Sequence, residues 1–343
     1  MDRTTVAIDL AKTIFEVAIS RQPGHIHQRR RLSRARLGPF LAELPPATVL
    51  LEACGSAHFW ARLAQAHGHQ AVLLPPHATR PYVLRDKTDR ADARALLEAF
   101  RNQDIHPIPV KSVDQQALTA LHRLRSAWLA TRTARLNALR GFLREFGVVI
   151  PLGARFVLPQ VHQLLGQSDS PLPATLQPVL ADTCAEIEEL ESRIRALEHQ
   201  LATLAQDLPV VAQLRSVPGV GLLTATALVA FVGNVHRFRS GRRFANYLGL
   251  TPREHSSGST RHLGKISKRG DPYLRMLLIH GARAVLCHAH RLPRPDRLRA
   301  WALHLEQLRG HNKAAVALAN KLARIVWAVW KSETRFQEEE LAA

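Results

Sequence analysis

The chain has 343 residues, 46% of them hydrophobic, which is enough for two or three folded domains and argues against a disordered protein. Its formal net charge of +19 raises the local concentration of polyanions, so nucleic acid is the expected partner ahead of an anionic membrane surface. Cys54, Cys184 and Cys287 are few, odd in number and far apart, which excludes a disulfide framework, and no second cluster completes a zinc site with Cys287, His288 and His290.

The first 110 residues alternate between strand and helix signals. Residues 4–20 predict two β-branched strands around a turn at Lys12, and the segment RRRLSRA predicts a third, strongly basic strand. A helix through residues 40–44, an apolar strand at 48–52, a helix over 58–67 and the strand AVLLPP follow. This order predicts an α/β domain with a mixed sheet over residues 1–110.

The middle of the chain, residues 111–206, predicts long helices. Leucines recur at helical spacing among many arginines over 112–146, which indicates an amphipathic helix with a basic face, and the Pro-, Gly- and Ser-rich segment 151–180 predicts a break. The coiled-coil seam expected next consists of Ile187, Leu190, Ile194, Leu197, Leu201 and Leu204. The heptads fit an intrachain hairpin and a dimer equally well, because they do not identify the partner helix.

Residues 207–343 predict a mainly helical domain. The segment SVPGVGLLTATALVAFVG resembles a helix-hairpin-helix element, whose amides can face a phosphate, although a plain packed helical hairpin fits it as well. In the last helix Val326, Trp327 and Trp330 share a face that we expect in the core. Charged residues interrupt this helix and the N-terminus MDRTTVAID has no apolar leader, so we expect a cytoplasmic, nucleoid-associated protein without a membrane span.

Four carboxylates in three segments have the chemistry of a metal site. Asp9 and Glu52 each end an apolar strand, and Asp89 and Asp92 lie three residues apart on one face of an expected helix. Four acids brought together repel one another unless cations neutralise them, and Mg²⁺ prefers oxygen ligands. Any one of these acids alone is better explained as a surface acid or a helix cap, so the prediction depends on the set.

A serine-rich loop is the second candidate for chemistry. It contains Ser256, Ser257, Gly258, Ser259 and Thr260. The basic residues around it are Arg253, Arg261, Lys265, Lys268, Arg269 and Arg275, of which we expect all but Arg261 to bind nucleic acid. Nearby cations and metal lower the cost of a serine alkoxide, so the loop can supply a nucleophile. The alternative is a flexible loop that only grips phosphate.

The four acids resemble the DEDD pattern of a RuvC-like domain, a variation on the ribonuclease H fold. Together with DKTDRADA and GLTPREHSSGSTRHLGKISKRGDPYLR, they make the chain similar, from residue 6 to about 336, to the DEDD/serine transposases of insertion sequence family 110, which are related to the Piv invertases. The resemblance implies that Asp9, Glu52, Asp89 and Asp92 bind two Mg²⁺ ions. It also implies that Ser257, directly before Gly258, is the nucleophile, although the loop offers four hydroxyl groups.

The resemblance further implies a recombinase that works as a homo-oligomer, a dimer or tetramer, with DNA as substrate. The RuvC-like domain of one subunit would meet the serine domain of another, and a noncoding bridge RNA would pair with donor and target DNA. A covalent phosphoserine preserves the phosphodiester energy for rejoining strands. Two other functions remain open: a metal-only structure-specific nuclease of the Holliday-junction resolvase type, and an inactive nucleic-acid-binding protein.

Overall fold

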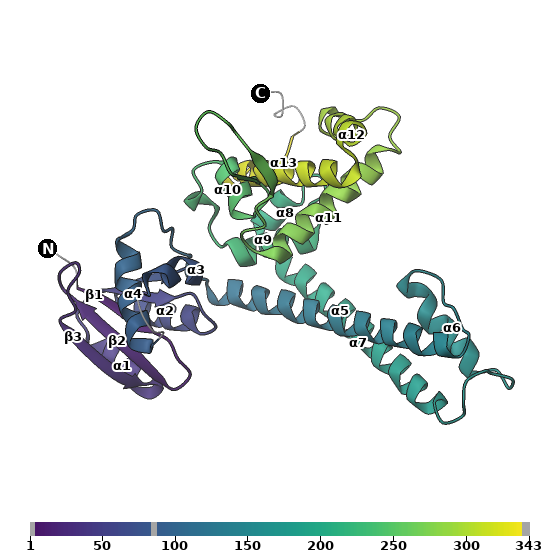
Figure 1. Ribbon diagram of the computed structural model, residues 1–343, viewed down its shortest axis with the longest axis horizontal. Coiled ribbons are helices and arrows are strands. Elements are labelled where there is room, and N and C mark those ends of the chain that lie inside the picture. The colour runs from purple at the N-terminus through teal and green to yellow at the C-terminus, as the bar shows by residue number, and fades with distance from the viewer. Residues whose placement is uncertain (1–3, 84–87, 338–343) are drawn as a thin grey trace. The chain divides into compact units, whose positions relative to one another are not determined.

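The computed structural model describes residues 4–83 and 88–337, so Asp86 and Lys87 of the segment DKTDRADA lie outside the described residues. The chain folds into two compact units, Met1–Asp114 and Gln115–Ala343. The first is a sheet with helices on its faces, and the second is built mainly from helices (Figure 1). The division into three domains at residues 110 and 206 stays a prediction.

The first unit contains, in chain order, β1 (Thr5–Asp9), β2 (Ile14–Ser20), β3 (Gln28–Ser33), α1 (Arg34–Glu43), β4 (Thr48–Glu52), α2 (Ala57–Ala66), β5 (Gln70–Leu74), α3 (Pro76–Thr79), the 3-10 turn η1 (Arg80–Tyr82) and α4 (Asp89–Arg101). The strand order in the sheet is β3-β2-β1-β4-β5. β2 is antiparallel to both β1 and β3, whereas β4 runs parallel to β1 and to β5. The mixed sheet predicted from the sequence is therefore confirmed.

Alternate residues of the strands pack on opposite faces of this sheet, as the two-residue period of a strand requires. Val6 and Ile8 of β1 lie in one buried cluster with residues of α1 and α2. Ala7, together with Leu50 of β4, lies in another cluster with Leu96 of α4. The same alternation puts Asp9 and Glu52, which follow Ala7 and Leu50 by two residues, on the α4 side of the sheet.

The remainder of the chain contains α5 (Val113–Glu145), η2 (Ala154–Phe156), α6 (Val157–Leu165), α7 (Gln177–Gln206), α8 (Pro209–Leu214), α9 (Leu222–Val232), η3 (Val235–Arg237), α10 (Gly241–Tyr247), β6 (Pro252–Glu254), β7 (Leu263–Ile266), α11 (Pro272–Ala289), α12 (Arg297–Arg309) and α13 (His311–Ser332). The predicted break at 151–180 is thus only partly a break. Residues 157–165 form α6 because Val157 and Val161 bury an apolar face against α5 and α7.

α5 and α7 pair with each other inside the chain and run antiparallel. Arg132 pairs with Glu191 at 2.7 Å and Arg135 with Glu186 at 2.6 Å, while apolar residues of both helices share buried clusters. The predicted seam of α7 is buried as far as Leu201, but Leu204 is 39% exposed. The seam therefore matches the intrachain hairpin, and it ends one leucine earlier than the heptad pattern predicts.

The last helices share the largest buried cluster, which combines α9, α10, α11 and α13. Val326 is fully buried and Trp330 is 8% exposed, while Trp327 packs on this core and donates its indole NH to the carbonyl of Phe238 at 3.2 Å. The predicted core face of the last helix is therefore confirmed. None of the helices among the described residues has an apolar stretch long enough to span a membrane.

Candidate active site

Three of the four predicted acids converge in the first unit. Asp9 stands at the end of β1, and Asp89 and Asp92 lie in the first turn of α4, which covers that face of the sheet. One carboxylate oxygen from each residue lies within 4.8 Å of the others. Asp9 and Asp92 are half-buried and Asp89 is exposed. Three close carboxylate oxygens form a donor set that fits a hard divalent cation.

The start of α4 is defined by its cap. Thr88 has extended backbone angles, and its hydroxyl accepts the backbone NH of Ala91 at 3.2 Å, which satisfies one of the free donors in the first turn. Asp89 and Asp92 lie next to the positive end of the helix dipole, a favourable position for acidic side chains. The prediction that these two acids share a helix face is confirmed.

Glu52 lies at the same end of the sheet as Asp9, since Ile8 of β1 pairs in register with Leu51 of β4. Its Oε2 accepts a hydrogen bond from the buried hydroxyl of Thr79 at 3.2 Å. Among the described residues, the group with oxygens within 4.8 Å contains the three aspartates and not Glu52. The assignment of Glu52 as a metal ligand stays a prediction.

Another carboxylate on this face, Glu16, was not singled out from the sequence. It is the register partner of Asp9 across the antiparallel β1–β2 pair, so the two side chains share a face. Arg31 of β3 holds Glu16 through an ion pair of 2.8 Å. The sequence signal that could have identified Glu16 is the turn at Lys12. Folding the chain back at that turn pairs the strand IFEVAIS with the strand that ends at Asp9, and places Glu16 opposite Asp9.

The serine loop is the tip of a two-stranded hairpin in the second unit. β6 and β7 pair antiparallel, and beyond them the backbone NH groups of Ser257 and Thr260 donate to each other's carbonyl oxygens at 3.3 and 3.1 Å. Gly258 turns the chain with a φ of +56°, a conformation that favours glycine. All residues of the loop are exposed, so their hydroxyl groups are accessible.

The serines of this loop differ in what their hydroxyl groups contact. Ser256 donates to Glu254 Oε1 at 2.8 Å and accepts the backbone NH of His262 at 3.3 Å. The hydroxyl of Ser257 makes no hydrogen bond with any residue that the structure describes. A hydroxyl engaged in two structural contacts is less available for attack, which favours Ser257 over Ser256.

The basic residues around the loop fall into two groups. Lys265, Lys268 and Arg269 are exposed on or directly after β7. Arg253 and Arg275 instead form hydrogen bonds with the backbone. Arg253 donates to the carbonyl oxygen of Ser267 at 3.2 Å, and Arg275 donates to that of Leu248 at 3.3 Å. Their positive charge still contributes to the field at the hairpin, which is favourable for a polyanion.

The base of the hairpin is fixed by close backbone approaches. A Cβ built on Gly249 would lie 2.0 Å from the carbonyl oxygen of Arg269, and one built on Gly270 would lie 2.0 Å from that of Tyr247. Lys268, two residues before Gly270, adopts a φ of +54°, and its backbone NH donates to the carbonyl oxygen of Gly249 at 3.1 Å. Only glycine fits these two positions, so the geometry of the base depends on them.

Comparisons with known proteins give one consistent result. The model of the Transposase IS116/IS110/IS902 family matches residues 211–299, and a transposase model for the DEDD domain of IS110 matches residues 6–148. A probable family 20 transposase of Pseudomonas aeruginosa is 42% identical, over 98% of this chain and 99% of its own length. The transposase for insertion sequence element IS1328 of Yersinia enterocolitica is 37% identical, and the pilin gene-inverting protein of Moraxella lacunata is 24% identical, each over 98% of this chain and 99% of its own.

Proposed function

This chain belongs to the IS116/IS110/IS902 family of transposases, and we propose that it excises and inserts its element through a covalent phosphoserine intermediate. As a transposase it is an enzyme that cleaves and transfers DNA strands. The observation that carries the proposed mechanism is the convergence of Asp9, Asp89 and Asp92 within 4.8 Å, in a chain that also presents an exposed serine hairpin.

The acids are proposed to hold Mg²⁺, with Asp9, Asp89 and Asp92 as ligands and Glu52 as the fourth carboxylate. Bound metal supplies positive charge to phosphate oxygens during displacement at phosphorus. α4 contributes by fixing two of the carboxylates in one rigid turn, and β1 contributes by presenting Asp9 from a buried strand. Such rigid supports keep the oxygens in place without a cost at each turnover.

Ser257 is proposed as the nucleophile. Its hydroxyl gives up a proton as its oxygen forms a bond to phosphorus, the bond from phosphorus to a sugar oxygen breaks, and that sugar oxygen takes up a proton. A hydroxyl at another DNA end then attacks the phosphoserine, loses its proton, and returns the serine to its starting state. The number of phosphoester bonds is the same at each step, so no nucleotide cofactor is needed.

Basic side chains are proposed to position the DNA. Lys265, Lys268 and Arg269 are exposed beside the serine hairpin, and Arg253 and Arg275 add charge while they support its backbone. Charged side chains of this kind contact phosphates and give affinity without reading the base sequence. We assign these five residues to DNA binding for that reason.

The division of labour follows the predicted domains. We propose that residues 1–110 form the RuvC-like metal-binding domain and that 111–206 form a helical spacer with a coiled-coil seam. Residues 207–343 would carry the nucleophile and a helix-hairpin-helix-like element at 216–233. A bridge RNA and a dimeric or tetrameric assembly are further proposals, which come from family resemblance. The arginines of β3 and the basic face of α5 are compatible with phosphate contacts by such an RNA.

The experiment that tests this function is a search for a covalent adduct. The purified protein is incubated with Mg²⁺, the noncoding RNA that adjoins its gene and labelled DNA from the element end, and the products are separated in SDS. We expect an SDS-resistant protein–DNA adduct that Ser257→Ala eliminates and that EDTA suppresses. Cleavage without an adduct would replace the proposal with a metal-only, resolvase-type nuclease.

A further inference from the structure

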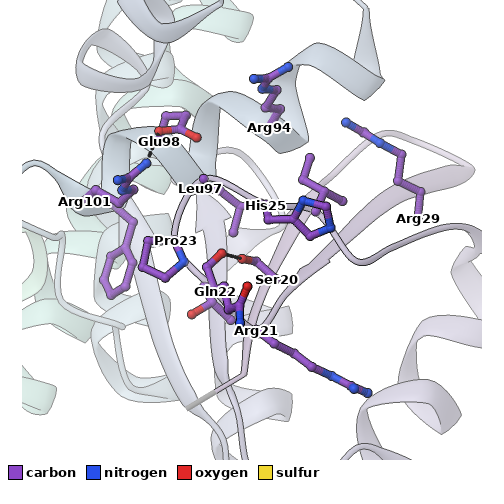
Figure 2. Close-up of a pocket in the computed structure, with 14 residues that line it drawn as sticks. Ser20, Arg21, Gln22, Pro23, His25, Arg29, Arg94, Leu97, Glu98 and Arg101 are labelled. Atoms are coloured by element: carbon purple, nitrogen blue, oxygen red, sulfur yellow. Dashed lines mark hydrogen bonds and ion pairs between the residues drawn. The ribbon is translucent and has the colours of Figure 1, made fainter. Parts of the chain in front are cut away.

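A pocket of about 370 Å³ lies in the first unit, and Asp9, Asp89 and Asp92 are not among the residues that line it. One side is the connection from β2 to β3, residues 21–26, and the other is the later half of α4, from Arg94 to Arg101. Thr5 and Ser20, which pair in register, form its floor at the end of β1 opposite to Asp9. Figure 2 shows these elements meeting around His25 and Pro23.

The lining of the pocket is strongly basic. Arg29, Arg94 and Arg101 line it together with His25. The side chain of Arg21 extends away from the others (Figure 2). Glu98 is the acidic residue of the lining, and it pairs with Arg101 at 2.9 Å. The charge of Arg101 is therefore balanced in part within the pocket, but Glu98 leaves a net positive lining around Arg29 and Arg94.

Two features of the chain hold this arrangement in place. Gly24, with a φ of +79°, lets the β2–β3 connection turn, and a Cβ built on it would lie 3.5 Å from Arg101 Nη1, in ordinary contact. Arg29 donates to the carbonyl oxygen of Arg90 at 3.1 Å, which directs its guanidinium toward α4. Arg29 is thus positioned by a backbone contact and Arg101 by its ion pair with Glu98.

The arginines also repel one another. Burial and the neighbouring charges of Arg90 and Arg94 lower the pKa of Arg29, with Glu16 acting in the opposite direction. Like charges held close together favour the binding of an anion between them, because the anion removes the repulsion. A guanidinium offers several NH donors in a planar fork that matches phosphate oxygens, so an oxyanion of this kind suits the lining.

We infer that this pocket binds a backbone phosphate of a nucleic acid strand, through Arg29 and Arg94 with Arg101 at its rim. The inference rests on the proposed function, since it assigns a phosphate anchor to a DNA-strand-transferring enzyme. From Thr5 to Asp9, β1 rises about 13 Å at the usual strand spacing. The floor of the pocket and Asp9 are therefore far enough apart for one strand to place one phosphate in the pocket and a different phosphate at the aspartates.

The test measures protection of individual arginines. The full-length protein is treated with phenylglyoxal in EDTA, alone and with a 30-nucleotide duplex DNA or a 30-nucleotide RNA, and modified arginines are mapped by mass spectrometry. We expect Arg29 and Arg94 to react with phenylglyoxal at least threefold more slowly in the presence of the DNA or the RNA, whichever of the two binds the pocket. Arg36, on α1 across the sheet, is the control whose rate should stay the same.

Each outcome of that experiment bears on the inference. Protection by the DNA, by the RNA or by both supports it and identifies the source of the phosphate. Equal rates for Arg29 and Arg94 with and without either nucleic acid overturn it, as does equal protection of Arg36. Because no metal or cleavage is involved, protected arginines without a serine adduct would count against the proposed function and not against the pocket.

A pair of variants gives a second measurement. The double variant Arg29→Gln and Arg94→Gln is expected to raise the Kd of the protected nucleic acid about tenfold, as the loss of a charge-assisted contact predicts. The slope of log Kd against log salt should become shallower by about one to two, which corresponds to one or two lost phosphate contacts. Arg36→Gln should change neither, and a double variant that matches Arg36→Gln in both readouts contradicts the inference.

Discussion

Ser256 and Glu254 are joined by a 2.8 Å hydrogen bond in which the serine hydroxyl donates to the carboxylate. The same hydroxyl accepts the backbone NH of His262 from the returning arm of the hairpin, and Arg261 adds an ion pair of 3.2 Å to Glu254. The contacts with Ser256 and Arg261 lower the pKa of Glu254, so it stays ionised at neutral pH. Ser256 therefore joins the two arms of the hairpin, while its neighbour Ser257 faces the solvent.

The two serines should respond differently to the loss of their hydroxyl groups. We expect Ser256→Ala to keep adduct formation within about tenfold of wild type, because it loses two exposed hydrogen bonds that support the hairpin and not the attacking group. Ser257→Ala should form no adduct. The measurement is the fraction of labelled DNA that stays with the protein in SDS, and the reverse pattern would assign the attack to Ser256.

The aspartate cluster should determine divalent-metal affinity. We expect Asp89→Asn to raise the Kd of Mn²⁺, measured by calorimetric titration, at least about tenfold, because it removes a charged oxygen from the group within 4.8 Å. Glu52→Gln should have a smaller effect, about threefold, since Thr79 already engages its carboxylate. Asp104→Asn, in the loop after α4, is the control, and an unchanged Kd for Asp89→Asn would remove the metal assignment.

The buried imidazole of His122 should make stability depend on pH. Its Nδ1 lies 3.0 Å from the hydroxyl of Tyr273 and its Nε2 3.1 Å from that of Thr226. Burial, assisted by the charge of Arg125, lowers the pKa of His122 from 6.5 to about 4. The unfolded chain therefore binds more protons than the folded chain between these values. The contribution of the neutral, buried His122 to the unfolding free energy is therefore complete above pH 6.5 and is lost as the pH falls toward 4.

Urea unfolding can measure this effect. We expect the unfolding free energy of the second unit to fall by about 2 kcal/mol on account of His122 when the pH changes from 7.5 to 5. Of the five tryptophans, Trp128, Trp301, Trp327 and Trp330 lie in this unit, so their fluorescence reports its unfolding. His122→Gln should be less stable at pH 7.5 but lack this part of the pH dependence. An equal slope in the variant and the wild type would contradict the assignment.

Much of the fold was predictable because local patterns decide it. The apolar runs of β1 and β4 predict strands that end at Asp9 and Glu52, and in the structure these two strand ends lie side by side in one sheet. The spacing of Asp89 and Asp92 likewise predicts their common helix face. These features depend only on neighbours in sequence and on the two basic periods of secondary structure.

The sequence pattern could not predict side-chain contacts between residues that lie far apart in the chain. The hydroxyl of Thr79 donates a hydrogen bond to the carboxylate of Glu52, which lies 27 residues earlier in the chain, and no spacing in the sequence indicates that contact. The role of Ser256 depends on His262 across the turn, and the basic pocket combines the β2–β3 connection with α4. Leu204 fits the heptad but is exposed, and the next residue, Ala205, is buried in its place.

Gly270 should be far less tolerant of substitution than Gly258, although both have positive φ angles, of +93° and +56°. An alanine Cβ at 270 would lie 2.0 Å from the carbonyl oxygen of Tyr247, whereas one at 258 would meet nothing within 4 Å. We expect Gly270→Ala to cost at least about 3 kcal/mol of unfolding free energy, through steric overlap and backbone strain together. Gly258→Ala should cost about 1 kcal/mol, through backbone strain alone. Urea unfolding of both variants is the measurement, and equal losses would mean that the approach of Gly270 to Tyr247 does not fix the base of the serine hairpin.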